Sequence, residues 1–172
     1  MALKLEFTMD DKTFRHSLNG HGVVMHSHHY LALITKLVED LGDLGGPQIL
    51  FEVVEESMRT ILDDYFQKNS VSSAEDRCRA GEDYFSTFGL GKMQITGDEN
   101  NGEVKLTSSH IDEGWAMKWG AHSKPINHLA RGFIAAIFSA AFNKPPKSYD
   151  INETASIVTG QPESTFIVTA LP

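Results

Sequence analysis

The sequence contains one cysteine among its 172 residues, Cys78, and this scarcity excludes an intramolecular disulfide and any zinc site that needs several thiolates. Positively charged residues are also few, because the sequence has 15 Lys and Arg residues and 23 Asp and Glu residues, which gives a formal net charge of −8. A field of this sign repels phosphate backbones, so we expect no nucleic-acid partner.

A long hydrophobic run is missing as well. The longest apolar stretch, residues 129–142, contains Arg131 and is shorter than the roughly 20 residues that cross a bilayer. It predicts a buried helix and no membrane insertion. The first ten residues alternate apolar and polar side chains and lack the apolar run of a secretory signal, so we expect a cytoplasmic protein.

The overall composition is that of an ordinary globular domain, with 41% apolar and 22% charged residues. A chain of this length fits one domain. We expect a single unit over residues 1–172, in three parts. Residues 1–29 form a strand region and a histidine-rich segment, residues 30–91 are helical, and residues 92–172 contain a hairpin, a long helix and a C-terminal hairpin.

Hydrophobic periodicity predicts the elements within these parts. Leu3, Leu5 and Phe7 alternate with polar residues, as in a half-buried strand. Apolar residues at helical spacing predict helices over 30–41 and 47–66, and a more polar helix follows from residue 72. Alternation predicts strands at 93–96, 104–107, 149–158 and 165–171, whereas 110–122 is irregular. This segregation of strands and helices indicates an α+β fold, with an antiparallel sheet packed against a helical layer.

Four of the histidines lie close together near the N-terminus. If residues 23–27 are extended, His26 and His28 project from one face, and such a pair can present two imidazoles to a metal ion. The candidate metal ligands are His21, His26, His28 and His29, and the cofactor would be a transition metal ion, zinc or iron, or a haem. Further ligands could come from Glu52, Glu56, His110, His122 or His128. The alternative is that these histidines make ordinary hydrogen bonds and the glutamates belong to a solvated face.

The predicted long helix alternates bulky residues with Ala, Gly and Ser around its cylinder. Its small residues permit either close helix packing or a cavity beside the helix. Aromatic side chains from neighbouring segments would suit the lining of an apolar pocket with polar handles. The residues that we expect to line such a pocket are Tyr84, Trp115, Trp119, Phe133 and Ile137.

The C-terminal half resembles a known family. The segments 128–136 (HLARGFIAA), 149–156 (YDINETAS) and 160–166 are similar to the ending of the 4-vinyl reductase domain family, also called hydrocarbon-binding proteins. The resemblance is clearest over residues 115–168. It implies an α+β domain that encloses a small hydrophobic molecule and is related in fold to haem-based nitric oxide sensors and to TRAPP tethering subunits.

One departure from the family pattern concerns metal binding. Many members carry zinc-binding cysteines after a glutamate, whereas here Glu153 is followed by Ser156 and Ser164. Serine is a poor zinc ligand, so we do not expect the family's zinc site in this chain.

Three functions remain open at this point. The first is binding of a small hydrophobic or aromatic molecule by a stand-alone ligand-binding or sensor domain, as a homodimer held by apolar helix faces. The second is a metal- or haem-dependent enzyme that uses the N-terminal histidines. The third is a protein-interaction subunit of the tethering type, which would show a large exposed apolar patch and a filled interior.

Overall fold

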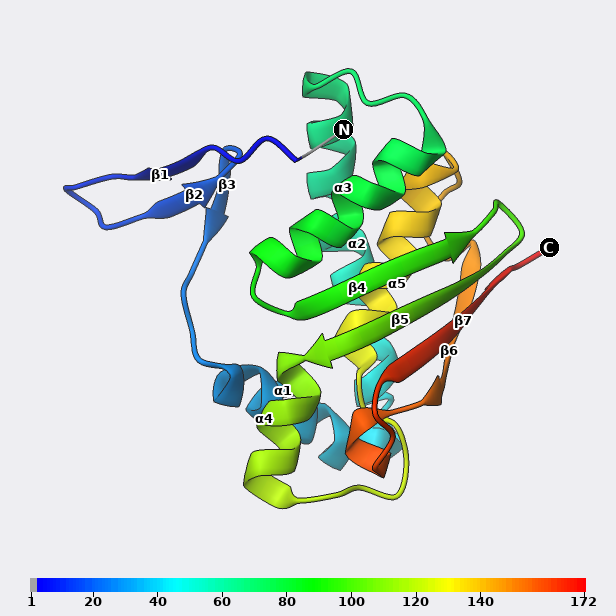
Figure 1. The fold of residues 1–172 in the computed structure, drawn as a ribbon. Coiled ribbons are helices and arrows are strands. Elements are labelled where there is room, and N and C mark those ends of the chain that lie inside the picture. Colours follow the sequence, from blue (N-terminus) through cyan, green and yellow to red (C-terminus); the bar gives the residue numbers. More distant parts are fainter. Residues whose placement is uncertain (1–2) are drawn as a thin grey trace.

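A computed structural model of the chain describes residues 3–172, apart from the side chain of His28. It begins with a small antiparallel sheet of three strands, β1 (Phe7–Met9), β2 (His16–Leu18) and β3 (His21–Val23), which projects from the body (Figure 1). The tight turn between β2 and β3 places Asn19 and Gly20 at φ 51° and 84°. Asn and Gly are the residues that tolerate this conformation, which is why the turn forms there.

The main sheet has four antiparallel strands in the order β4-β5-β7-β6. The strands are β4 (Gly91–Gly97), β5 (Asn101–Ser109), β6 (Tyr149–Ala155) and β7 (Ser164–Ala170). Along β6 and β7, buried residues such as Ile151 and Val168 alternate with exposed ones, so one face of the sheet packs on the core.

Helices α3 (Ala74–Thr87) and α5 (His128–Ala141) pack on the sheet, and α2 (Gly46–Lys68) packs on α5. Helices α1 (His28–Asp40) and α4 (His110–Trp119) pack against each other, and short 3₁₀ turns lie at η1 (Gly42–Leu44) and η2 (Ile157–Thr159). The expected α+β class is therefore confirmed. No helix among residues 3–172 is both long and apolar enough to span a bilayer.

Helix α5 is the centre of the fold. Twelve of its fourteen residues are buried, because it lies between α2 and the sheet and also packs against α3 (Figure 1). A Cβ on Gly132 would lie 2.4 Å from the carbonyl oxygen of Phe51 in α2, and a Cβ on Gly81 of α3 would lie 2.6 Å from Ile137. These small residues thus serve close packing of the helices rather than a cavity between them.

Two segments differ from the sequence-based expectation. Residues 110–119 form the helix α4, which Ser109 caps by accepting a hydrogen bond from the backbone N–H of Asp112. Strand β3 ends at Val23, and residues 24–27 have no regular structure before α1 begins at His28. His26 and His28 therefore do not lie on one face of a strand, because His28 already belongs to α1.

Candidate functional site

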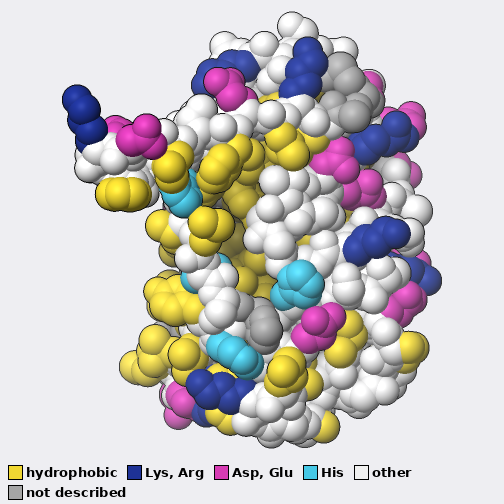
Figure 2. Space-filling model, turned by 60° about the vertical axis from the view of Figure 1, so that its left-hand side comes forward, with side chains coloured by type: hydrophobic (Ala, Val, Ile, Leu, Met, Phe, Trp, Pro, Cys, Tyr) yellow, Lys and Arg dark blue, Asp and Glu magenta, His cyan; other side chains and the backbone are white. Residues whose placement is uncertain are grey.

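An apolar groove of about 720 Å³ lies between the N-terminal sheet and the helices. Figure 2 shows it as a hollow beside the projecting N-terminal arm, with hydrophobic side chains gathered in it. Three of its lining residues are polar, namely His26, Ser57 and Thr87. The lining contains no Lys, Arg, Asp or Glu. The apolar lining residues are Phe7, Leu18, Val23, Val24, Met25, Leu31, Val53, Val54, Met58, Phe88, Leu90, Leu129 and Phe133.

The groove brings together segments that are distant in sequence. Helix α5 contributes Leu129 and Phe133, α2 contributes Val54 and Met58, and the segment after α3 contributes Leu90. The remaining wall comes from the N-terminal sheet and the chain that follows it. A groove of this size and composition falls in the range of small-molecule sites, which are mostly apolar with a few polar groups.

Polar contacts hold the N-terminal sheet over the helices. The backbone N–H of Lys4 donates to the hydroxyl of Tyr65 at 2.9 Å, and the amide of Asn19 donates to the hydroxyl of Tyr84 at 2.5 Å. His21 Nε2 lies 2.9 Å from Asp64 Oδ2. On the outer side, Val24 and Met25 remain 81% and 80% exposed, so this wall is only partly packed and leaves room for a ligand to cover apolar surface.

Of the residues expected to line a pocket, Phe133 lies in the groove and is 1% exposed. Tyr84 is fully buried behind it, with its ring 5.8 Å from the ring of Phe88, which does line the groove. Ile137 packs against α3. Trp115 and Trp119 contact each other in α4 with tilted rings whose centroids are 4.9 Å apart, and neither lines the groove. The structure therefore does not bring the five residues together.

Sequence reasoning missed most of the lining. Val54 and Met58 stood out only as part of the apolar stripe of α2, and Val24 and Met25 precede the histidines without a clear period. One signal was present in the sequence, namely the apolar run Val23, Val24 and Met25 between Gly22 and the histidines. Such a run indicates contact with another apolar surface.

The N-terminal histidines are distributed rather than clustered. His21 pairs with Asp64, which also binds Lys68, and His26 lines the groove with its ring 5.2 Å from that of Tyr30. His29 is exposed, and the side chain of His28 lies outside the described residues. In the described part of the chain, no three His, Cys, Asp or Glu side chains are grouped so that they could hold a metal ion. Metal binding by these histidines stays a prediction.

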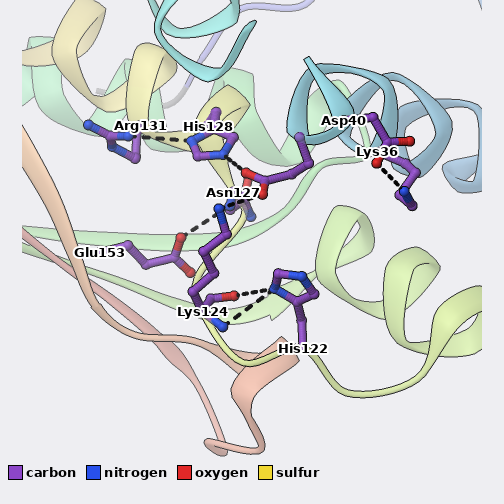
Figure 3. A network of polar contacts seen from close by, with 9 residues as sticks. Lys36, Asp40, His122, Lys124, Asn127, His128, Arg131 and Glu153 are labelled. Carbon is purple, nitrogen blue, oxygen red and sulfur yellow. Dashed lines mark hydrogen bonds and ion pairs between the residues drawn. The ribbon is translucent and has the colours of Figure 1, made fainter. Parts of the chain in front are cut away.

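The other proposed metal ligands make ordinary polar contacts. Glu52 binds Lys147 at 2.7 Å and Gln48 at 2.8 Å. His128 Nε2 lies 2.5 Å from Glu39 Oε1, and Lys124 Nζ lies 2.9 Å from Glu39 Oε2 (Figure 3). This network ties the end of α1 to the start of α5. Burial raises the pKa of Glu39, but the hydrogen bonds from Lys124 and His128 together outweigh it and hold that pKa below its ordinary value.

The same network predicts a pH dependence of stability. Burial lowers the pKa of His128 more than Glu39 raises it. The unfolded chain therefore takes up this proton at a higher pH than the folded chain, and His128 costs stability as the pH falls through its unfolded pKa of about 6.5. We expect the decrease in unfolding free energy between about pH 7.5 and 5.5 to be smaller in His128→Gln than in the wild type, as measured by urea denaturation. Equal decreases would contradict this role.

The residues around Glu153 do not fit zinc. Ser156 and Ser164 are fully buried beside this glutamate, and neither a thiolate nor an imidazole accompanies them in the described contacts. Burial, and next the neighbouring carboxylate of Asp112, raise the pKa of Glu153 to about 7. The contacts described around Glu153 thus come from carboxylate, hydroxyl and amide groups, and the absence of the family's zinc site stays a prediction.

No protein-family model and no curated protein matches the sequence. Among solved structures, the phenol-responsive sensory domain of the transcription activator PoxR, solved with phenol, matches with a TM-score of 0.78 at 15% identity, over 95% of this chain and 84% of that one. This chain has the same fold.

Two further structures match less closely. A vinyl-4-reductase family protein from Methanocaldococcus jannaschii matches with a TM-score of 0.53 at 16% identity, over 72% of this chain and 68% of that one. A trafficking protein particle complex subunit 3 from Naegleria fowleri, covalently bound to palmitic acid, matches with a TM-score of 0.51 at 13% identity, over 84% and 95%. The expected fold relationships are confirmed, and at these identities they concern the fold alone.

Proposed function

We propose that this protein binds a small, uncharged hydrophobic or aromatic molecule in the apolar groove, as a ligand-binding or sensor domain. The observation that carries the proposal is the groove itself, whose lining is apolar apart from one His, one Ser and one Thr side chain. The fold supports it, since a phenol-responsive sensory domain has the same architecture over nearly the whole chain.

The chemistry of the lining defines the class of ligand. Burying an apolar molecule here removes both ligand and protein surface from water, at about 25 cal/mol per Å². A charged ligand would lose its hydration without an opposite charge in the lining to compensate. His26 and Ser57 can each hydrogen-bond to a hydroxyl group, so a phenol is accommodated better than a carboxylate.

Calorimetric titration with paired compounds tests the proposal. Phenol and toluene should bind with a negative heat-capacity change, whereas benzoate and benzenesulfonate should not bind measurably. Mass spectrometry of solvent extracts from the purified chain would identify a ligand retained from the host. The proposal would be contradicted if charged and neutral compounds bound equally. It would also be contradicted if none of the four compounds bound and the extract contained no apolar compound.

A metal- or haem-dependent function of the histidine segment is the second proposal, supported by the position of His26 on the groove. A metal at this position would leave open coordination sites toward a bound molecule. Elemental analysis and an absorption spectrum of untagged protein test it. Close to one equivalent of zinc or iron, or a Soret band, would support it, and less than about a tenth of an equivalent with no Soret band would end it.

We also propose that the chain forms a homodimer in the cytoplasm. Leu33, Leu37, Leu44 and Ile49, on α1, η1 and α2, are 46–75% exposed, and a second copy could cover them. Light scattering after size-exclusion chromatography should give twice the chain mass, and Leu37→Glu with Leu44→Glu should give the single mass. A wild-type monomer at about 100 μM would contradict a stable dimer.

A further inference from the structure

A short apolar segment lies at the rim of the groove. Residues 24–27, which we call the strap, connect β3 to α1 and have no regular secondary structure. Val24, Met25 and His26 of the strap line the groove. Val24 and Met25 are 81% and 80% exposed, so most of their apolar surface faces water at the mouth of the groove. Burial of this surface would be favourable.

The strap makes few contacts of its own. Within the described chain, Val24, Met25 and His26 form no hydrogen bond through either backbone or side chain. The His26 ring lies 5.2 Å from the ring of Tyr30, which is in the first turn of α1. Ser27, at the start of that helix, forms no capping hydrogen bond through its side chain. The first three residues of the strap can therefore change their backbone conformation without breaking a hydrogen bond.

The elements on either side of the strap are fixed to the helices. Before the strap, Asn19 donates a hydrogen bond to the hydroxyl of Tyr84, and His21 pairs with Asp64. After it, Leu31 of α1 is only 8% exposed. A segment that is anchored at both ends and free between them can move as a hinged flap.

The facing wall of the groove belongs to the core. Met58 of α2 and Phe133 of α5 line the groove and are 7% and 1% exposed. An apolar molecule bound against them would present a surface onto which Val24 and Met25 can fold. Folding would remove the exposed apolar surface of both side chains from water, and this favours closure.

We propose that the strap is a lid that closes over a bound apolar molecule and buries Val24 and Met25 against it. This inference rests on the proposed function, because the lid closes on the ligand of that same groove. Closure adds contacts that must be broken before the ligand leaves. The strap therefore sets the dissociation rate of the ligand more than its association rate.

Hydrogen exchange followed by mass spectrometry tests the lid in the wild-type chain. The amides of Met25 and His26 have no acceptor among the described residues, so they exchange quickly in the protein alone. Saturating toluene should slow exchange in the strap at least about fivefold, because closure withdraws its amides from water. Residues 120–124 are also irregular and lie outside the groove lining, so their exchange should not change.

Met25→Ser tests whether the lid retains the ligand. Its dissociation rate for toluene, measured from NMR line shapes, should exceed that of the wild type at least about tenfold, while the association rate stays within about twofold. Met117→Ser is the matched control, because Met117 is 72% exposed on α4 and lies outside the groove lining. Its two rates should equal those of the wild type.

Failure of the lid is distinguishable from failure of the proposed function. The lid alone is overturned if toluene binds to the wild type but the strap exchanges as fast as it does without toluene. It is also overturned if Met25→Ser and Met117→Ser release toluene at the same rate. If neither titration nor solvent extraction reveals an apolar ligand, the lid and the proposed function are both overturned.

Discussion

Gly132→Val should lower the free energy of unfolding by about 3 kcal/mol, because helices α2 and α5 touch at this glycine without room for a side chain. A Cβ here would lie 2.4 Å from the carbonyl oxygen of Phe51 and 2.9 Å from the Cβ of Val54. The first of these atoms belongs to the backbone of α2, so relief requires movement of a whole helix. Urea denaturation of the purified variant measures the loss.

Gly42→Val is the matched control for this experiment. Nothing lies within 4 Å of a Cβ built on Gly42, which sits in the surface turn η1. Its unfolding free energy should stay within about 0.5 kcal/mol of the wild type. If Gly132→Val proves equally mild, the close approach of α2 and α5 would be wrong, and with it the position of the groove residues that these helices contribute.

Ser57→Trp should reduce the affinity for phenol or toluene at least about tenfold, equivalent to about 1.4 kcal/mol. Ser57 is an exposed residue of α2 that lines the groove, so an indole at this position can occupy the space of the ligand without disturbing the core. The same calorimetric titration that establishes binding to the wild type measures the change.

Thr60→Trp provides the comparison for that variant. Thr60 lies one helical turn further along α2, is exposed, and is not part of the groove lining. This variant also adds one exposed tryptophan to α2, but its indole lies outside the groove and should leave ligand affinity unchanged. Equal losses in the two variants would mean that the indole acts through stability or non-specific association rather than by filling the groove.

Elements that carry their own local signal could be predicted from the sequence. Pro47 at the start of α2, followed by Met58 and Leu62 at helical spacing, predicted a helix over 47–66, and α2 spans Gly46–Lys68. The alternation around 93–96 and 104–107 likewise predicted the β4–β5 hairpin. Helix α4 was missed, although Ser109 and Asp112 follow the spacing of a capping pattern, because the helix is short, contains Gly114 and carries the apolar Met117 on its exposed face.

The candidate site could not be predicted in the same way. Its lining combines residues such as Leu18, Met58 and Phe133, whose proximity depends on tertiary packing and leaves no trace in local periodicity. Trp115 and Trp119 were attractive candidates because of their size and polar handles, yet their rings contact each other within α4 and neither lines the groove. Phe133 lines the groove on the central helix, where its ring contacts the rings of Phe85 and Phe88.

Methyl NMR of protein labelled with ¹³C at its methionine methyl groups tests the central claim, that the groove binds small apolar molecules, most directly. Met25 and Met58 line the groove, whereas Met93 of β4 and Met117 of α4 lie elsewhere. On titration with phenol or toluene, the methyl signals of Met25 and Met58 should shift progressively and saturate, while those of Met93 and Met117 stay in place. Unchanged signals of Met25 and Met58 at saturating compound, or shifts confined to Met93 and Met117, would contradict the account.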